Sequence, residues 1–348
     1  MSGGVDSSVV AGILKEEGYE VIGITLQLYN SKQEIKTKTC CSGVDIYDAK
    51  EVARKLEIPH YVLNYQEKFK KLVIDNFIHS YKNGETPIPC LQCNQHIKFE
   101  DLLITAKGLG AEFLATGHYI RKKIINNHMG LFKAKDQAKD QSYFLFQVKE
   151  KDLSFLKFPL GDLLKDETRS LAKKYKIPVA DKPESQDICF IPDGNYRKFL
   201  SKYKGFNIAG NILDTKGNTI GKHKGIENYT IGQRKQINVD MNKALYVISI
   251  SKENNNIIVG EKEELRSKEI YIDQLNWLGD KNDLKNKIHN DLNIKVRARQ
   301  ETIKGRLELL ANNKGKVLLN HDTYAVSKGQ GCVFYNNNDQ LLGGGWIK

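Results

Sequence analysis

The first half of the chain alternates between two hydrophobic patterns. Apolar positions recur at helical spacing over residues 7–18, 45–56, 65–82 and 94–108, and short apolar runs typical of buried strands occupy 21–28, 61–63 and 112–116. Strands that alternate with helices in this way predict a parallel sheet covered by helices, with ligands bound at the carboxyl ends of the strands.

The pattern changes near residue 205. Short alternating segments separated by Gly and Asn predict all-β structure, and they lie at 245–250, 257–260, 294–299, 306–310 and 316–319. We therefore expect an α/β domain over 1–200, a small β-rich central domain over 201–265 and a C-terminal β-barrel domain over 266–348. The run Gly343-Gly344-Gly345 predicts a tight bend in a strand.

The opening segment Ser2-Gly3-Gly4-Val5-Asp6-Ser7-Ser8 is the most informative part of the chain. A glycine pair flanked by hydroxyls leads directly into the first predicted helix, where free N–H groups favour an anion. The segment therefore predicts a phosphate-binding loop. It lacks the lysine and the spacing of GxxxxGK[ST], which argues against a kinase or motor ATPase loop. The strand expected before such a loop is missing, so either the true start lies upstream or the sheet is one strand short.

The charge balance suggests a partner for this chain of 348 residues. The formal net charge is +12, which predicts a polyanionic partner, and RNA is the simplest one. Asparagine runs at 254–256 and 336–338 favour compositional bias as the alternative explanation. Apolar runs stay below the ~18 residues of a membrane span, and the N-terminus does not resemble a signal peptide. We expect a cytosolic protein with no membrane partner.

Six cysteines in such a chain indicate catalysis or metal binding rather than a disulfide framework. Cys90 and Cys93 stand just before the helix predicted to begin near residue 94, where the helix dipole favours a thiolate. Cys189 lies in a polar, loop-like segment. Cys332 lies in an apolar strand pattern and is expected in the core, whereas the pair Cys40-Cys41 is ambiguous.

Eight motifs then occur in a fixed order, namely SGGVDSS, PCLQCNQHIKF, ATGHY, KDQSYFL, SQDICF, YTIGQRKQI, VRARQ and GQGCVFY. With them the chain resembles the bacterial tRNA-specific 2-thiouridylases of the ATP-pyrophosphatase (PP-loop) superfamily, over nearly its whole length. The resemblance implies a sulfurtransferase that modifies the wobble uridine of tRNA. In that reaction ATP adenylates the C2 oxygen, and sulfur follows from a cysteine persulfide.

The same resemblance implies roles for individual residues. ATP, with Mg²⁺ expected beside it, would be held by Ser2, Gly3, Gly4, Val5, Asp6, Ser7, Leu26 and Gly117. Cys189 would carry the persulfide, loaded by a sulfur carrier or a cysteine desulfurase. Cys93 would be the nucleophile, which either attacks C2 or resolves the persulfide by forming a Cys93–Cys189 disulfide. Both thiols must then come within bonding reach.

The resemblance also implies contacts with the anticodon loop of tRNA. Single-stranded RNA loops are recognised through bases splayed out of the stack, so the target base needs a pocket. The implied pocket residues are Ile88, Pro89 and Cys90, with His118 close by. The implied tRNA contacts are Lys139, Asp140, Gln141, Arg297, Ala298 and Gln330.

The chain departs from the family pattern at three of these positions. Ile88 replaces the Asn of some members, Cys90 replaces the Asp of others, and Ala298 stands where an aromatic residue is frequent. Together with Cys93 and Cys189, Cys90 provides three thiolates, which raises the hypothesis of an iron–sulfur cluster with one open iron.

Two other functions remain open from the sequence. Another PP-loop ATP-pyrophosphatase ligase, adenylating a small molecule, would account for the loop but would leave Cys93, Cys189 and the β-rich part without a role. A non-catalytic RNA-binding module with a vestigial nucleotide site is the second alternative, and the missing first strand favours it. Pyrophosphate exchange into ATP that depends on tRNA would distinguish the three.

Overall fold

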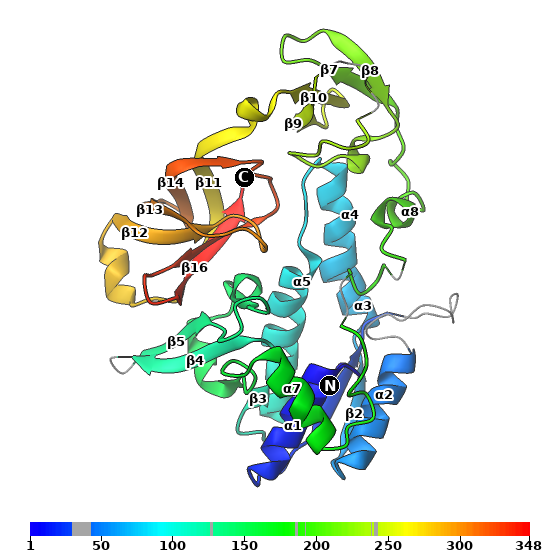
Figure 1. Cartoon of the computed structure of the whole chain (residues 1–348), viewed down its shortest axis with the longest axis vertical. Coiled ribbons are helices and arrows are strands. Elements are labelled where there is room, and N and C mark those ends of the chain that lie inside the picture. The colour runs from blue at the N-terminus through cyan, green and yellow to red at the C-terminus, as the bar shows by residue number, and fades with distance from the viewer. Residues whose placement is uncertain (30–42, 126–127, 185–186, 192, 238, 240–242) are drawn as a thin grey trace. The chain divides into compact units, whose positions relative to one another are not determined.

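The chain divides into two compact units, drawn with their elements in Figure 1. The computed structural model describes residues 1–29, 43–125, 128–184, 187–191, 193–237, 239 and 243–348. Unit 1 comprises Met1–Ile74, Cys90–Asn195 and Asp339–Leu341, and unit 2 comprises Asp75–Pro89, Tyr196–Asn338 and Leu342–Lys348. The ambiguous pair Cys40-Cys41 lies outside the described residues.

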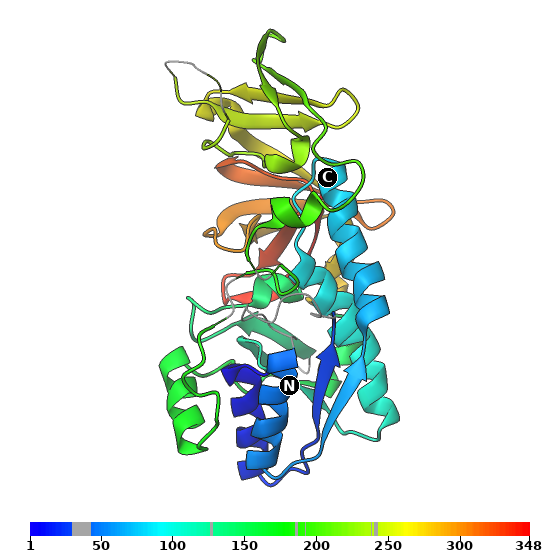
Figure 2. The same cartoon turned by 90° about the vertical axis from the view of Figure 1, so that its right-hand side faces the viewer.

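Short parallel strands and helices form unit 1. Strand β1 (Gly23–Gln27) pairs in parallel with β2 (His60–Asn64), and the two run side by side in Figure 2. Strand β3 (Leu114–Ala115) pairs in parallel with β6 (Leu156–Lys157). The alternation with α1 (Val5–Glu16) and α2 (Gly43–Lys55) confirms the predicted parallel α/β arrangement.

The predicted helices at 65–82 and 94–108 are composite. The first consists of α3 (Gln66–Phe69), the π-helical η1 (Lys70–Ile74) and α4 (Asp75–Lys82). The second consists of α5 (Pro89–Gln92), the π-helical η2 (Cys93–Leu102) and α6 (Leu103–Gly108), so it begins earlier than predicted.

The rest of unit 1 contains elements that the sequence pattern did not reveal. These are η3 (Ser142–Leu145), η4 (Glu150–Phe155), α7 (Lys165–Lys174) and the antiparallel hairpin of β4 (Ile120–Ile125) and β5 (His128–Lys133). Gln340 and Leu341 extend this hairpin by pairing with β5.

Helix α1 is fixed by apolar packing along its length. Val9, Val10 and Leu14 are buried in one cluster with Val52 of α2 and Ala172 of α7. Burying this stripe supplies most of the stability of such a helix. The packing therefore fixes the position of the helix start, where the predicted phosphate loop lies.

The β-rich part of unit 2 contains a small sheet of order β8-β7-β10-β9. Its strands are β7 (Gly210–Leu213), β8 (Thr219–His223), β9 (Tyr246–Ser251) and β10 (Asn256–Gly260), and η5 (Ile226–Asn228) follows β8. Ile212, Val247 and Ile257 are fully buried in its core. Within the same unit, α4 meets α8 (Tyr196–Leu200) through stacked rings of Tyr81 and Tyr196, whose centroids are 4.9 Å apart.

Six strands close into a barrel of order β11-β14-β13-β12-β15-β16, with β16 pairing back to β11, and apart from Gln340 and Leu341 their residues belong to unit 2. The strands are β11 (Arg266–Trp277), β12 (Ile288–Lys295), β13 (Ile303–Leu310), β14 (Lys314–Tyr324), β15 (Gly331–Tyr335) and β16 (Gln340–Ile347). Two 3₁₀ turns, η6 (Lys262–Leu265) and η7 (Lys281–Lys285), flank β11. The predicted barrel is confirmed, and Cys332 is fully buried in it, as expected.

Two local predictions for the barrel were wrong. The strand predicted at 294–299 ends at Lys295, because the Arg297 guanidinium donates to the carbonyl oxygens of Ile231 and Ala325 and holds the chain in a turn. The glycines at 343–345 lie inside β16 rather than in a bend. A Cβ on Gly343 would lie 2.1 Å from the Asn276 carbonyl oxygen, so glycine permits close strand contact there. Among the described helices, all are too short or too polar to cross a membrane.

Candidate active site

The segment Ser2–Ser8 forms a tight loop at the start of α1. Gly3 has a φ of +69°, and a Cβ there would lie 2.3 Å from the Asp45 carbonyl oxygen, so only glycine fits. The Ser7 hydroxyl accepts from the Ser2 backbone N–H at 3.0 Å, and the Ser8 hydroxyl donates to the Gly4 carbonyl at 2.8 Å. Because Gly4 is the N-cap and has no side chain, the first amides of α1 are suited to an anion.

Gly117 packs directly against this loop. A Cβ on Gly117 would lie 2.9 Å from the Ser7 nitrogen and 3.0 Å from the Asp6 carbonyl carbon. The other predicted ATP residue away from the loop, Leu26, is buried in β1 opposite Leu63. The structure therefore brings Gly117 to the loop and places Leu26 in the adjoining parallel sheet.

Lys182 anchors the loop on another side. Its ammonium group donates to the Gly3 carbonyl at 3.0 Å and to carboxylate oxygens of Asp45 and Asp48, each at 2.6 Å. Burial lowers the pKa of Lys182, but the hydrogen bonds to Asp45 and Asp48 outweigh it and leave the pKa above its usual value. The loop is therefore fastened by a permanent cation.

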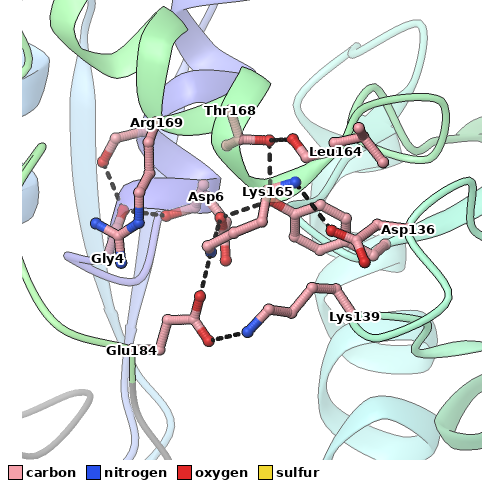
Figure 3. Close-up of polar contacts among 12 residues, drawn as sticks. Gly4, Asp6, Asp136, Lys139, Leu164, Lys165, Thr168, Arg169 and Glu184 are labelled. Atoms are coloured by element: carbon pink, nitrogen blue, oxygen red, sulfur yellow. Dashed lines mark hydrogen bonds and ion pairs between the residues drawn. The ribbon is translucent and has the colours of Figure 1, made fainter.

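Asp6 is the acceptor at the centre of a second polar group, shown in Figure 3. Lys165 donates to the Asp6 carboxylate at 2.7 Å and forms an ion pair with Glu184 at 3.2 Å. Lys139 donates to the other Glu184 oxygen at 2.7 Å. The Tyr119 hydroxyl lies 3.1 Å from Asp6, and burial, reinforced by the Asp6 charge, raises its pKa.

Sequence reasoning missed Lys165, Glu184, Tyr119 and Lys182. One signal for Lys165 was available, because it opens helix α7, where a positive charge opposes the helix dipole. A cation at a helix start indicates that a nearby anion outweighs the dipole. The other three carry no comparable local signal.

Cys93 lies one turn inside a helix rather than at its start. The helix begins at Pro89, so the free amides that would favour a thiolate lie a turn away from Cys93. The thiol is buried, and burial raises its pKa to about 11, with the charge of Lys98 acting in the opposite direction. The predicted thiolate character of Cys93 was therefore wrong for this conformation. Cys90, in the first turn, is exposed.

The segments that carry Cys93 and Cys189 pack against the same helix. Phe190, next to Cys189, places its ring edge-on to Phe69 of α3, with the centroids 5.7 Å apart. Helix η2, which begins at Cys93, also contacts α3. Cys189 itself is half-buried. The contact of η2 with α3 includes the ion pair of Lys68 with Asp101 at 2.7 Å, eight positions after Cys93, so it does not by itself place the two thiols together. Residues 185–186 and 192, on either side of Cys189, lie outside the described residues.

The three thiols do not fit the predicted cluster. Within the described residues, which include Cys90, Cys93 and Cys189, no group of three His, Cys, Asp or Glu side chains is placed to hold a metal ion. An iron–sulfur cluster with one open iron requires three thiolates around that cluster. We therefore derive no step through a cluster.

His118 follows Gly117 and is buried. Its Nδ1 lies 2.8 Å from the Thr116 hydroxyl, and its ring packs against Phe99 with centroids 5.6 Å apart. Burial lowers the pKa of His118 well below its ordinary value, and the charge of Lys98 lowers it further. His118 is therefore a neutral imidazole at neutral pH, placed one residue from the loop contact.

The predicted tRNA residues of unit 1 fix the turn at 134–142. Asp140 accepts from the Ala134 backbone N–H at 3.0 Å and from the Ser142 hydroxyl at 2.6 Å. The Gln141 side-chain oxygen accepts from the Tyr119 backbone N–H at 2.9 Å. Of the three, Lys139 alone carries a positive charge that a phosphate would attract, and it is bound to Glu184.

The predicted tRNA residues of unit 2 lie in two separate places, one at the segment 86–89 and the other at the turn that contains Arg297 and Ala298. Ile88 and Pro89 are buried, and the segment before them is fastened by Gln330, which donates to the Thr86 carbonyl at 2.8 Å. Arg297 donates to Ser327 at 3.0 Å as well as to the turn carbonyls described above, and Ala298 is half-exposed. Gln330 therefore lies beside the predicted base pocket segment, whereas Arg297 holds loops of its own unit together.

Comparison with known families gives the class to which this fold belongs. A tRNA methyl transferase HUP domain matches residues 1–193, a tRNA methyl transferase PRC-barrel domain matches 197–261, and an aminomethyltransferase β-barrel domain matches 267–347. Similarity to solved structures is weak. An NMN synthetase from Francisella tularensis aligns with a TM-score of 0.34 and 18% identity over 53% of this chain and 63% of that chain.

Curated relatives define the family within this class. The chain is 51% identical to the tRNA-specific 2-thiouridylase MnmA of Orientia tsutsugamushi, over 100% of this chain and 94% of the relative. It is 50% identical to the protein of the same name from Rickettsia felis, over 100% of this chain and 95% of that relative. The chain belongs to the tRNA-specific 2-thiouridylase family.

Proposed function

We propose that this protein catalyses the ATP-dependent 2-thiolation of the wobble uridine of tRNA. The observation that carries the proposal is that one unit contains the predicted phosphate loop, Cys93 and Cys189. The names of the relatives, which are tRNA-specific 2-thiouridylases, support the same substrate. The net charge of +12 suits a polyanionic partner.

The first step is adenylation. A uridine carbonyl is a poor electrophile, and transfer of AMP from ATP to its O2 atom, with release of pyrophosphate, converts that oxygen into a leaving group. Gly3, Gly4 and the first amides of α1 would hold the phosphates. Mg²⁺ is usually bound by substrate phosphates and one or two carboxylates, and Asp6 is the carboxylate of this loop.

The second step is sulfur transfer. The terminal sulfur of a Cys189 persulfide attacks C2, and AMP departs with the former O2. The Cys93 thiolate then attacks the Cys189 sulfur, which breaks the sulfur–sulfur bond, leaves sulfur on C2 and forms a Cys93–Cys189 disulfide. A cellular thiol reduces that disulfide, and a sulfur carrier or cysteine desulfurase in the cytosol reloads Cys189.

Recognition of the base would place a flipped uridine beside Ile88, Pro89 and Cys90, near His118. His118 is neutral because of burial, so it would donate or accept a hydrogen bond there without adding charge. The small-molecule ligase alternative gives no role to the two thiol segments, and the non-catalytic alternative gives none to the intact phosphate loop.

Incubation of unmodified tRNA with protein, ATP and a persulfide donor tests the proposal, with nucleoside mass analysis for 2-thiouridine. Cys93→Ser and Cys189→Ser should each lose turnover, whereas Cys332→Ser, in the barrel core, is the matched cysteine control and should retain it. Each active-site variant should still bind ATP. Absence of 2-thiouridine from the wild-type reaction, or full turnover by either active-site variant, would contradict the proposal.

A further inference from the structure

Four side chains of alternating charge connect the phosphate loop to a predicted tRNA contact (Figure 3). Lys139 binds Glu184 at 2.7 Å, Glu184 pairs with Lys165 at 3.2 Å, and Lys165 binds Asp6 at 2.7 Å. The four belong to different segments of unit 1, separated by up to 178 positions in the sequence. We call this group the charge chain.

Lys165 occupies a position that helix stability does not favour. It opens α7, where the helix dipole repels a cation, and only 10% of its side chain is exposed. Removing a charge from water is costly unless partners compensate for it, and Asp6 and Glu184 are those partners. The backbone N–H of Lys165 donates to Asp136 at 3.0 Å, which fixes the residue at this helix start.

The phosphate loop lacks a lysine of its own, unlike loops that grip the phosphates with GxxxxGK[ST]. Lys182 is committed to Gly3, Asp45 and Asp48. Lys165 is therefore the cation in direct contact with Asp6, the loop carboxylate, and it reaches the loop from a helix far along the chain. Lys165 and the Tyr119 hydroxyl both bind the Oδ1 atom of Asp6, and the Lys165 charge offsets the carboxylate charge that would attract Mg²⁺.

Glu184 is shared between two lysines. Hydrogen bonds from Lys139 and Lys165 lower the pKa of Glu184, although burial, the largest single influence, raises it, so the carboxylate is ionised at neutral pH. If a tRNA phosphate takes Lys139, Glu184 is left with Lys165 as its cation among these four groups. Glu184 then attracts Lys165 more strongly, which would weaken the pairing of Lys165 with Asp6 and leave the Asp6 carboxylate available to Mg²⁺. The ammonium group has three N–H donors, so it can bind Glu184 and a phosphate oxygen at once.

We propose that Lys165 is the phosphate-binding cation of the ATP site and that Glu184 is a positioning residue through which tRNA bound at Lys139 tightens the binding of ATP. This inference rests on the proposed function, since it takes ATP and tRNA as the two ligands. Linkage requires the effect to be reciprocal, so ATP also tightens the binding of tRNA.

Binding of α,β-methylene-ATP with Mg²⁺, measured with and without unmodified tRNA, tests the charge chain without any chemical step, because this analogue cannot be split between its α and β phosphates. In the wild type we expect tRNA to tighten analogue binding by about 5-fold or more. Glu184→Gln should reduce that factor to about one while the protein still binds both ligands. Lys165→Met should abolish the effect of tRNA and weaken analogue binding in the presence of tRNA about 10-fold relative to the wild type, the effect of losing one charged contact of about 1.4 kcal/mol.

Lys139→Met provides a second route to the same result, because it removes the other partner of Glu184. It should abolish the effect of tRNA on analogue binding by raising binding without tRNA to the level that the wild type reaches with tRNA, since Glu184 is then left with Lys165 as in the tRNA complex. Lys135→Met is the matched control, since Lys135 pairs with Glu167 of the same helix α7 at 3.2 Å outside the charge chain, and it should behave as the wild type.

The outcomes separate this inference from the proposed function. A wild-type protein whose analogue binding ignores tRNA, or Glu184→Gln and Lys139→Met variants that keep the full tRNA effect, would overturn the inference even when 2-thiouridine is formed. A wild-type protein that shows the coupling but forms no 2-thiouridine with a persulfide donor would refute the proposed function and leave the charge chain supported.

Discussion

The phosphate loop and the thiol segments of the same unit are prepared for chemistry to different degrees. In the loop, glycine is the residue that fits at position 3, and the Lys182 ammonium group donates a hydrogen bond to the Gly3 carbonyl oxygen. At the thiols, Cys93 is buried with a pKa of about 11, so about one molecule in ten thousand carries the thiolate at pH 7. In the proposed reaction the nucleotide half is therefore preorganised, whereas the sulfur half would require Cys93 to leave its buried environment or to gain a cation.

The largest effect expected from this difference concerns the reactivity of Cys93. Because the thiolate is the nucleophile and its population rises tenfold per pH unit below the pKa, labelling of Cys93 by iodoacetamide should accelerate about 1,000-fold between pH 7 and pH 10. Tandem mass analysis that assigns the label to Cys93, rather than to the exposed Cys90 of the same peptide, measures the rate. Cys332, fully buried in the barrel, should stay unlabelled throughout and reports that the protein remains folded.

A labelling rate that is already maximal at pH 7 would mean that Cys93 is an activated thiolate before tRNA arrives. The contrast between the two halves would then disappear. A labelling rate that becomes fast at pH 7 only when tRNA and ATP are added would sharpen the contrast. It would show that binding of the substrates changes the buried environment of Cys93.

The second prediction tests the loop itself. Gly3→Ala should weaken ATP binding by about 100-fold or more, because the new Cβ meets the Asp45 backbone at 2.3 Å and the loop must open. Gly18→Ala is the matched control, since Gly18 has a φ of +85° and open space around its Cβ position. Both variants place an alanine at a positive φ, so both carry backbone strain, but the clash with the Asp45 carbonyl oxygen occurs in Gly3→Ala and not in Gly18→Ala.

Equilibrium binding of ATP, together with melting temperatures of both variants, separates a damaged site from a destabilised fold. Equal loss of ATP affinity in the two variants would indicate that strain alone, rather than the shape of the loop, explains the result. The preorganised character assigned to the nucleotide half would then be unfounded.

The same difference explains what the sequence was able to predict. The loop was predicted because glycine and hydroxyl residues in a short motif report local backbone shape, whereas Gly117 was implied only by the family resemblance. The barrel was expected from alternating patterns, although the β4–β5 hairpin was missed. Lys165 and Asp6 are 159 positions apart, and nothing in the short-range pattern joins them.

Burial was the other property that local patterns misjudged. The spacing of Cys90 and Cys93 predicted a thiol at a helix start, but the helix begins four positions before Cys93 and packs that thiol inside the unit. A Cys-x-x-Cys motif specifies the distance between two thiols along the chain. It does not specify which of them faces water, and that choice decides the pKa.

The smallest expected effect concerns His118, which follows Gly117 and packs against Phe99 of η2. Its pKa lies well below 6.5 in the folded protein because of burial and returns to about 6.5 on unfolding. Below pH 6.5 the unfolded chain takes up a proton that the folded chain does not, so this residue lowers the free energy of unfolding as the pH falls, by up to about 1.4 kcal/mol per pH unit. His118→Gln removes that contribution.

Chemical denaturation of the wild type and His118→Gln between pH 5.5 and pH 8.5 measures the difference. His60, His223 and His289 also have lowered pKa values through burial, but they are present in both proteins and cancel in the comparison. The free energies of unfolding of the two proteins should run parallel above pH 7.5, where neither the folded nor the unfolded wild type binds the proton at His118. They should converge as the pH falls below 6.5. Parallel lines over the whole range would mean that His118 accepts a proton in the folded protein, and the neutral imidazole placed beside the loop would have to be abandoned.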